Sequence, residues 1–289
     1  MKIAVIGANG QLGHDSIQEI EKSGHTAIPL VHANIEITDK QSILNALEKA
    51  QADIVINTAA FHNVGKCETE PENAFLGNAW GAKNLAEASN ELGFYIIHIS
   101  TDYVFDGSKK APYLESDLPL PLNVYANTKL SGEYFIQSIA EKYIILRTCG
   151  LYGTEKCRAK GGVNFTELML KLAAERDELR VVDDEILTPT STREVARQMV
   201  ALFEKQPVGL AHATAEGQCS WYEFAKTIFE IAEVKTNLNI AAPGEFPTKV
   251  NRPSYSVLEN GFLKENRVNV LKHWKEGLEE YLLKERVKV

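Results

Sequence analysis

The sequence lacks both the long apolar runs of a membrane protein and the positive charge of a nucleic-acid-binding protein. No stretch of its 289 residues approaches the roughly 18 apolar residues that a transmembrane helix needs. A net charge of −8 disfavours a role that depends on neutralising nucleic-acid phosphates. The N-terminal apolar run is short and ends at Gly7, so no secretory signal peptide is predicted. We therefore expect a cytoplasmic protein with neither a membrane nor a nucleic acid as partner.

Cysteine is also scarce, and its spacing indicates no metal centre. The four cysteines form no C-x-x-C pair and no ligand spacing with the seven histidines. They are Cys67, Cys149, Cys157 and Cys219. We expect reduced, structural thiols, as in a reducing compartment. The carboxylates of Asp183, Asp184 and Glu185 are expected to be solvated in a turn, and no metal site is predicted.

Short apolar runs alternate with helical patterns through the first half of the chain. This alternation predicts parallel strands covered by helices on both faces, in a doubly wound α/β sheet of the Rossmann type. The expected strands are 2–6, 26–30, 53–56, 94–99 and 143–147, and the expected helices are 12–22, 39–50, 72–92 and 127–141. Asp39 is expected to cap the second helix and Pro71 to begin the third.

The pattern changes after Gly150, where a polar, glycine-rich loop over 153–162 precedes a helix at 164–174. We expect residues 1–149 to form an NAD(P)-binding Rossmann domain and residues 150–289 to form mainly a smaller α/β substrate-binding domain. The chain is expected to return to the main sheet at about 176–215, through strands 179–182 and 209–213 and the helix 193–203. The tryptophans Trp80, Trp221 and Trp274 lie in helical patterns and are predicted to pack.

A glycine motif joins the first strand to the first helix. Gly7, Gly10 and Gly13 have the spacing G-x-x-G-x-x-G, with Asn9, Gln11 and Leu12 between them. Glycines let the backbone turn tightly and approach a pyrophosphate, whose charge meets the amides of the helix N-terminus. Three glycines could instead only punctuate a turn, but the strand–turn–helix context favours a dinucleotide site.

The second strand ends at Leu30-Val31-His32, without the carboxylate that commonly binds the adenosine ribose. Nothing there repels a 2′-phosphate, so NADPH is favoured and NADH remains possible. The further residues that we assign to the cofactor site are His32, Asp39, Asn57, Thr58, Ala59, Ala60, Asn78 and Ser100.

Tyr125 and Lys129 are four residues apart around the start of the fourth expected helix, and on a helix this spacing places both side chains on one face. A nearby ammonium lowers the pKa of a phenol toward the range in which proton transfer is efficient. The pair alone could be an ordinary surface pair. The hydroxyl-rich run Ser100–Gly107 follows the fourth strand, where ligands of open parallel sheets bind. Thr101 could therefore donate to a substrate carbonyl.

Together, Gly7–Gly13, Asn57–Ala60, Ser100–Gly107 and Tyr125–Lys129, followed by Arg147-Thr148 and Arg252–Ser256, resemble the dTDP-4-dehydrorhamnose reductase family. That family belongs to the extended short-chain dehydrogenases/reductases, and the likeness runs nearly end to end. It implies NADPH-dependent reduction of the 4-keto group of a nucleotide-linked 4-keto-6-deoxysugar, and a homodimer. It further implies that Thr101, Tyr125 and Lys129 are catalytic and that Tyr125 gives the proton. The substrate-binding residues that it implies are Thr101, Asp102, Tyr103, Asn164, Arg252 and Ser256.

The chain departs from the family pattern at the sugar end. Gly150 stands where the family commonly has a tryptophan near the sugar, and Val64-Gly65 stands for Val-Asp. The basic residues Lys156, Arg158 and Lys160 form either a solvated loop or a contact to the substrate pyrophosphate. The exact sugar and nucleotide therefore stay open.

Two other functions remain compatible with these residues. A nucleotide-sugar epimerase needs only the tyrosine and lysine pair, whereas a dehydratase needs a second carboxylate where Tyr103 follows Asp102. A non-catalytic NADP-binding subunit similar to the methionine adenosyltransferase beta subunits would bind a partner enzyme. The intact set Thr101, Tyr125 and Lys129 favours an enzyme over such a subunit.

Overall fold

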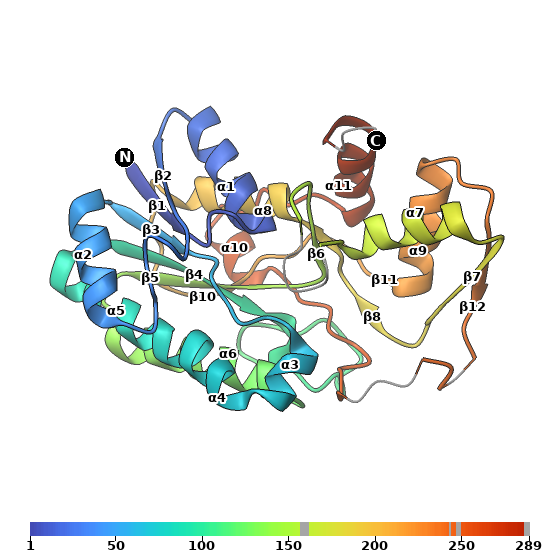
Figure 1. Cartoon of the computed structure of the whole chain (residues 1–289), viewed down its shortest axis with the longest axis horizontal. Coiled ribbons are helices and arrows are strands. Elements are labelled where there is room, and N and C mark those ends of the chain that lie inside the picture. The colour runs from blue at the N-terminus through green and yellow to red at the C-terminus, as the bar shows by residue number, and fades with distance from the viewer. Residues whose placement is uncertain (157–161, 243, 247–249, 286–289) are drawn as a thin grey trace.

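The computed structural model describes residues 1–156, 162–242, 244–246 and 250–285, and its centre is a six-stranded parallel sheet (Figure 1). The strand order β10-β5-β4-β3-β1-β2 confirms the predicted doubly wound fold. The strands are β1 (Lys2–Ile6), β2 (Thr26–Leu30), β3 (Ile54–Asn57), β4 (Tyr95–Thr101), β5 (Tyr143–Thr148) and β10 (Gly209–His212). All neighbouring pairs are parallel, so the carboxyl ends of all six strands lie at one edge of the sheet.

Helices cover both faces of this sheet because successive strand side chains point to opposite sides. On one face, Ile3 and Val5 of β1 pack with α1 (Gln11–Lys22), α8 (Thr192–Leu202) and α10 (Gly261–Glu265). On the other face, Ala4 and Ile6 pack with α2 (Lys40–Ala50), α5 (Gly81–Leu92) and α6 (Val124–Ile139). Both faces of β1 are therefore buried, which explains why its sequence is a continuous apolar run rather than an alternating one.

One strand prediction is wrong and one is confirmed. The segment expected at 179–182 does not return to the main sheet: β7 (Glu178–Val181) pairs instead with β12 (Asn237–Ile240). The strand expected at 209–213 does return, and β10 pairs with β5 at the sheet edge. The edge beside β5 accepts only one strand, so β7 forms its ladder elsewhere.

The predicted helix 72–92 is interrupted by a π-turn. The chain runs from α3 (Val64–Thr69), which was not predicted, into α4 (Pro71–Phe75) and a π-helical turn (Leu76–Trp80) before α5. Pro71 begins α4 as expected, because its missing N–H would have no partner in a first turn. Such turns hold one extra residue per turn and are frequent at functional sites. Trp80, predicted to pack, is half exposed and meets Phe135 edge-on.

The later half builds a smaller cluster beside the main sheet (Figure 1). Its core joins Phe224, Ile228, Trp274 and Leu278. Its elements are α7 (Phe165–Glu175), α9 (Trp221–Ile231), α11 (Trp274–Glu280), a π-turn (Tyr281–Glu285), and the paired strands β8 (Ile186–Leu187) with β11 (Cys219–Ser220) and β6 (Leu151–Tyr152) with β9 (Thr190–Ser191). Asn164 and Ser220 begin α7 and α9 with capping boxes, which satisfy first-turn amides.

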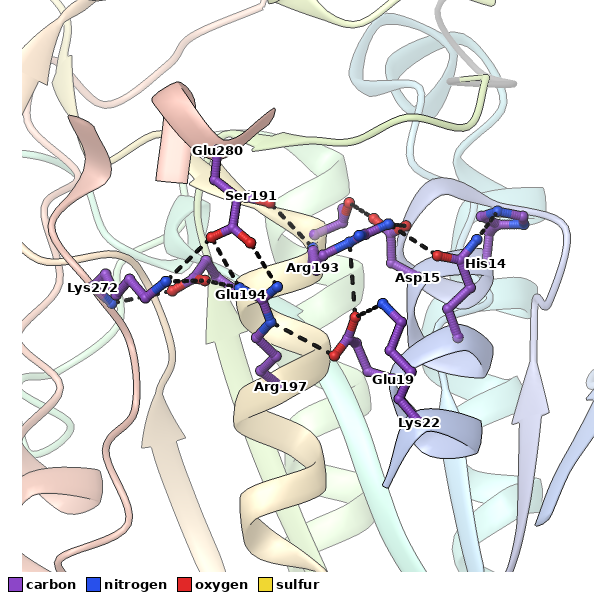
Figure 2. A network of polar contacts seen from close by, with 12 residues as sticks. His14, Asp15, Glu19, Lys22, Ser191, Arg193, Glu194, Arg197, Lys272 and Glu280 are labelled. Atoms are coloured by element: carbon purple, nitrogen blue, oxygen red, sulfur yellow. Dashed lines mark hydrogen bonds and ion pairs between the residues drawn. The ribbon is translucent and has the colours of Figure 1, made fainter. Parts of the chain in front are cut away.

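Ion pairs fix α8 between α1 and α11 (Figure 2). The guanidinium of Arg197 lies 2.8 Å from Glu280, 2.7 Å from Glu194 and 3.6 Å from Glu19. Hydrogen bonds from Arg197 and Lys272 lower the pKa of Glu280 to about 2. Through Arg197, α8 thus links α11 to α1, the helix that follows the glycine motif. Across the described ranges, no helix combines the length and the apolarity that a bilayer crossing requires.

Candidate active site

The glycine motif forms a tight turn between β1 and α1. Gly7 has a φ of +82°, and the amide of Gly10 donates to the Gly7 carbonyl at 2.9 Å. A Cβ on Gly13 would lie 2.2 Å from the Gly7 oxygen, and one on Gly7 would lie 2.6 Å from the Thr58 hydroxyl. Only glycine fits at these two positions. Because Gly10 caps α1 without a side chain, the first amides of α1 are open to an anionic ligand.

The glycine turn fits a dinucleotide phosphate. Two residues that were predicted to bind the cofactor instead use their side chains to hold the backbone of the neighbouring loop. Asn57 is buried, contacts His98 at 3.2 Å and accepts from the amide of Ala59 at 3.2 Å. Asn78, in the π-turn, holds both backbone groups of Phe61, at 2.7 and 2.9 Å. These side chains shape the loop after β3 and do not line the cleft in which Thr101 and Tyr125 lie.

The loop after β2 holds a carboxylate, that of Glu36, which the prediction missed. Nε2 of His32 lies 3.1 Å from Glu36, four residues later, although the strand sequence itself has no acid. Asp39 caps α2 as predicted, accepting from the amide of Gln41 at 2.9 Å. Its role in cofactor binding stays a prediction.

Thr101, Tyr125 and Lys129 come together at the carboxyl end of β4. The side chain of Asn123 accepts from the amide of Ala126 at 2.9 Å and so begins α6 three residues before the predicted start. Tyr125 therefore already lies in the first helical turn. Its phenol lines the same cleft as Thr101, whose hydroxyl opposes the rise in the phenol's pKa that burial causes. The two hydroxyls thus lie on the same side of the molecule.

The expected electrostatic effect of Lys129 on Tyr125 is not observed. Desolvation raises the pKa of Tyr125, and the Thr101 hydroxyl is the group that lowers it. The buried Lys129 ammonium donates to the Ile99 carbonyl at 2.6 Å instead of facing the phenol. The sequence could not predict this hydrogen bond, because it depends on how closely α6 packs on β4.

Burial lowers the pKa of Lys129 to about 8, although the neighbouring Glu133 opposes the shift. Lys129 lines the same cleft as Tyr125, and only its ammonium form can balance negative charge that develops there during reduction, so activity should require the protonated lysine. We expect kcat/KM for ketone reduction to fall as pH rises through about 8, because this parameter reports groups of the free enzyme. Initial rates between about pH 6 and pH 10 test this prediction. A profile that stays level to the alkaline limit would contradict it.

A buried ion pair lies behind Lys129. Arg147 on β5 donates to Glu133 on α6 through two nitrogens, at 2.9 and 2.6 Å. The hydroxyl of Ser100, predicted to bind cofactor, donates to the same carboxylate. A buried pair with this two-point geometry fixes α6 against β4 and β5. It thereby holds the backbone that carries Tyr125 and Lys129.

A second buried cluster surrounds Asp102. Its carboxylate accepts from the Cys149 thiol at 2.9 Å and from the Thr101 hydroxyl at 3.1 Å. The Ser256 hydroxyl is also in hydrogen-bonding reach of Asp102 and lies 3.8 Å from the Cys149 sulfur. Burial raises the pKa of Asp102. The three described cysteines are all free and buried, and Cys149 is the one that donates to Asp102.

These groups open into a cleft of about 300 Å³ between the main sheet and the smaller cluster. Thirteen predicted site residues line it: Gly10, Gln11, Leu12, Thr58, Ala60, Ser100, Thr101, Asp102, Tyr103, Tyr125, Lys129, Asn164 and Ser256. Three further residues that line the cleft were predicted either to pack or to be solvated: Lys156, Glu185 and Trp221. The indole of Trp221 donates to Glu185 at 3.1 Å and its ring meets Phe165. The pairing of β11 with β8 brings Trp221, the first residue of α9, beside Glu185, and no local sequence signal indicates this long-range contact.

At the expected sugar-binding end of the cleft, Gly150 stands where the family commonly has a tryptophan. Its φ is +55°, and a Cβ there would lie 3.1 Å from Leu187 and 3.2 Å from Pro189. The surrounding backbone therefore suits glycine and not the bulky residue expected from the resemblance. The exposed Arg252 lies outside the cleft lining; burial raises the pKa of Tyr103, and the charge of Arg252 opposes this rise. Arg158 and Lys160, the other two basic residues of the loop, lie outside the described residues.

A family model for the RmlD substrate binding domain matches residues 1–287. The chain belongs to the RmlD substrate binding domain family. This membership confirms the resemblance predicted from the motifs, and it covers nearly the whole chain rather than the glycine turn alone. No cluster of histidine, cysteine and acidic side chains suited to a metal ion occurs in the described part of the chain.

Three relatives illustrate how close the RmlD family likeness is. The spore coat polysaccharide biosynthesis protein SpsK of Bacillus subtilis (strain 168) is 40% identical over 97% of this chain and 96% of its own. A crystal structure of a dTDP-4-dehydrorhamnose reductase from Clostridium acetobutylicum ATCC 824 superposes with a TM-score of 0.92 at 39% identity, covering 98% of both chains. The dTDP-4-dehydrorhamnose reductase of Bacillus anthracis str. Ames, solved in complex with NADP, gives 0.90 at 35% identity, again covering 98% of both chains.

Proposed function

We propose that this enzyme uses NADPH to reduce the 4-keto group of a nucleotide-linked 4-keto-6-deoxysugar. One observation carries the proposal: the side chains of Thr101 and Tyr125 line the same cleft that the glycine turn also borders. The names of the reductase relatives and the NADP complex of one of them support the reaction class and the cofactor. NADH is a possible second donor, because Glu36 beside His32 could bind an unphosphorylated ribose.

In the proposed mechanism, the bound NADPH supplies the hydride. Tyr125 donates the proton to the carbonyl oxygen as negative charge develops there, and Thr101 donates a hydrogen bond to the same oxygen. The charged Lys129, which lines the same cleft, balances the negative charge that develops there during reduction. The buried pair of Glu133 and Arg147 keeps β5 and α6 in register, so the reacting groups stay aligned.

The nucleotide-sugar is proposed to lie between the two parts of the molecule. Residues 1–149 would hold the cofactor and residues 150–289 mainly the substrate, with Asp102, Tyr103, Asn164, Arg252 and Ser256 on the substrate side. Asn164 lines the cleft where the two parts come together: its amide donates to the Gly153 carbonyl at 2.9 Å, as does the amide of Gln11 in the glycine turn at 3.1 Å. One backbone carbonyl thus ties the substrate helix to the cofactor turn.

The deciding experiment incubates the protein with 4-keto-6-deoxysugars linked to different nucleotides and follows NADPH absorbance. Stoichiometric oxidation of NADPH, with a 4-hydroxy sugar as product, is the expected result. Isomerisation of a sugar without net NADPH consumption would identify an epimerase instead. No turnover with any of these sugars, together with an effect only in a partner enzyme's assay, would identify a regulatory subunit.

We also propose a cytoplasmic homodimer. The free, buried thiols of Cys67, Cys149 and Cys219 suit a reducing compartment, and the family resemblance suggests two chains. Light scattering of the purified protein tests the assembly: a mass near twice the 32.1 kDa of one chain is expected.

A further inference from the structure

The hydroxyl of Thr101 has more hydrogen bonds to make than its one proton allows. Its oxygen already accepts from the backbone amide of Tyr103 at 3.2 Å. Its proton points to Asp102, at 3.1 Å, when that carboxylate is ionised. A threonine hydroxyl offers one donor and two acceptor positions. With an ionised Asp102, Thr101 therefore has no proton left for a substrate carbonyl.

A protonated Asp102 removes this conflict. Its O–H then donates to the second acceptor position of Thr101, and the threonine proton becomes free to point into the cleft. The other carboxyl oxygen still accepts from the Cys149 thiol at 2.9 Å. The hydrogen bonds that join Cys149, Asp102, Thr101 and the substrate oxygen then all run in that direction.

The surroundings of Asp102 favour the neutral acid. Its side chain is 3% exposed, and those of Cys149 and Ser256 are 2% and 4% exposed. In the ranges that the structure covers, no lysine, arginine or histidine forms an ion pair with Asp102. The facing groups are hydroxyls, a thiol and the phenols of Tyr103 and Tyr125. A buried carboxyl without a cation is more stable with its proton on.

We propose that Asp102 acts as a neutral carboxylic acid that turns the Thr101 hydroxyl toward the substrate carbonyl. It is a positioning residue: it gives up no proton during turnover, and the proton that reaches the sugar still comes from Tyr125. This inference rests on the proposed reductase function and differs from the direct substrate contact that the resemblance implies for Asp102.

Replacement by asparagine separates a neutral donor from a charged group. The amide of Asp102→Asn can donate to Thr101 while its oxygen accepts from Cys149, so it reproduces the bonds of the neutral acid. Asp102→Leu keeps the size but removes both bonds. We expect kcat of the asparagine variant within about 5-fold of the wild type and kcat of the leucine variant lower by about 100-fold, with little change in KM, because an oriented donor acts in the transition state.

Three outcomes would overturn the proposal. An asparagine variant that folds but loses activity as fully as the leucine variant would require a charged Asp102. A leucine variant that retains wild-type kcat would remove the orienting role. A loss confined to KM in both variants would make Asp102 a direct substrate ligand. Melting temperatures identify a folding defect, and Cys219→Ala serves as a control for changes to a buried polar group away from Thr101.

A spectroscopic measurement on the wild type does not depend on turnover or on the leucine variant. With 13C at the aspartate side-chain carbonyls, the Asp102 signal should have the chemical shift of a neutral carboxyl at pH 7; the asparagine variant identifies the signal by its loss. A carboxylate shift would overturn the proposal even if the enzyme is active. If no ketosugar is reduced, the reductase function fails while the neutral-acid shift can still be observed.

Discussion

Replacing Tyr125 by phenylalanine is expected to lower kcat by about 10³-fold while NADPH still binds. A positioned general acid contributes about 10² to 10⁴ in rate, and the phenol is the proton donor within reach of Thr101. The ring of phenylalanine preserves the edge-on packing against Tyr103, 6.2 Å between centroids, so the fold and the cofactor turn should not change. Single-turnover rates and fluorescence titration with NADPH measure the two effects separately.

The matched control for this variant is Tyr95→Phe. Tyr95 lies at the other end of β4, and its hydroxyl donates to the Pro207 carbonyl at 2.6 Å, away from the cleft. Its loss should reduce stability by about 1 kcal/mol without a change in kcat. If Tyr125→Phe keeps more than a tenth of the wild-type kcat, Tyr125 does not supply the proton.

Replacing Gly13 by alanine is expected to weaken NADPH binding by at least about 100-fold. The added Cβ would lie 2.2 Å from the Gly7 oxygen and 2.8 Å from its carbon, and both are backbone atoms that cannot rotate away. The turn would have to open, which moves the amides of α1 from the position that an anion needs. Overpacking of this kind also costs about 1–3 kcal/mol of stability. Calorimetric titration with NADPH and thermal unfolding measure both losses.

Gly277→Ala provides the comparison in a helix. Gly277 lies in α11, and a Cβ there would meet its nearest neighbours at 3.6 Å or more, which is ordinary contact. Alanine favours a helix over glycine by about 1 kcal/mol, so this variant should be as stable as the wild type or more stable and should bind NADPH equally well. Wild-type affinity in Gly13→Ala would mean that the glycine turn does not receive the cofactor.

Gly150 departs from the family pattern, and its surroundings in the structure explain why a small residue stands there. Its positive φ and the nearness of Leu187 and Pro189 suit the small residue that the sequence has. Glu185 and Trp221 line the same cleft from the smaller cluster. Sugar preference is therefore expected to depend on these residues as well as on the catalytic ones, which is why the substrate panel spans several nucleotides and sugars.

Local sequence determined the features that depend on neighbouring residues. Apolar runs defined β1, β3, β4 and β5, because strands buried on both faces need no polar side chains. Glycine spacing located the turn after β1, and a separation of four residues placed Tyr125 and Lys129 on one helix face. The capping role of Asp39 was also readable, because its partner Gln41 is two residues away.

Only the tertiary structure decided the contacts between distant segments. It gave the edge beside β5 to β10 and not to β7, turned Lys129 toward Ile99, and placed Cys149 against Asp102. It also brought Trp221 to Glu185 across 36 positions of sequence. Such contacts depend on how helices and strands pack against one another. The sequence pattern around a residue does not indicate which distant side chain it will contact across a layer. The reaction class was therefore readable from local motifs, whereas the hydrogen bonds that orient its catalytic groups required the folded molecule.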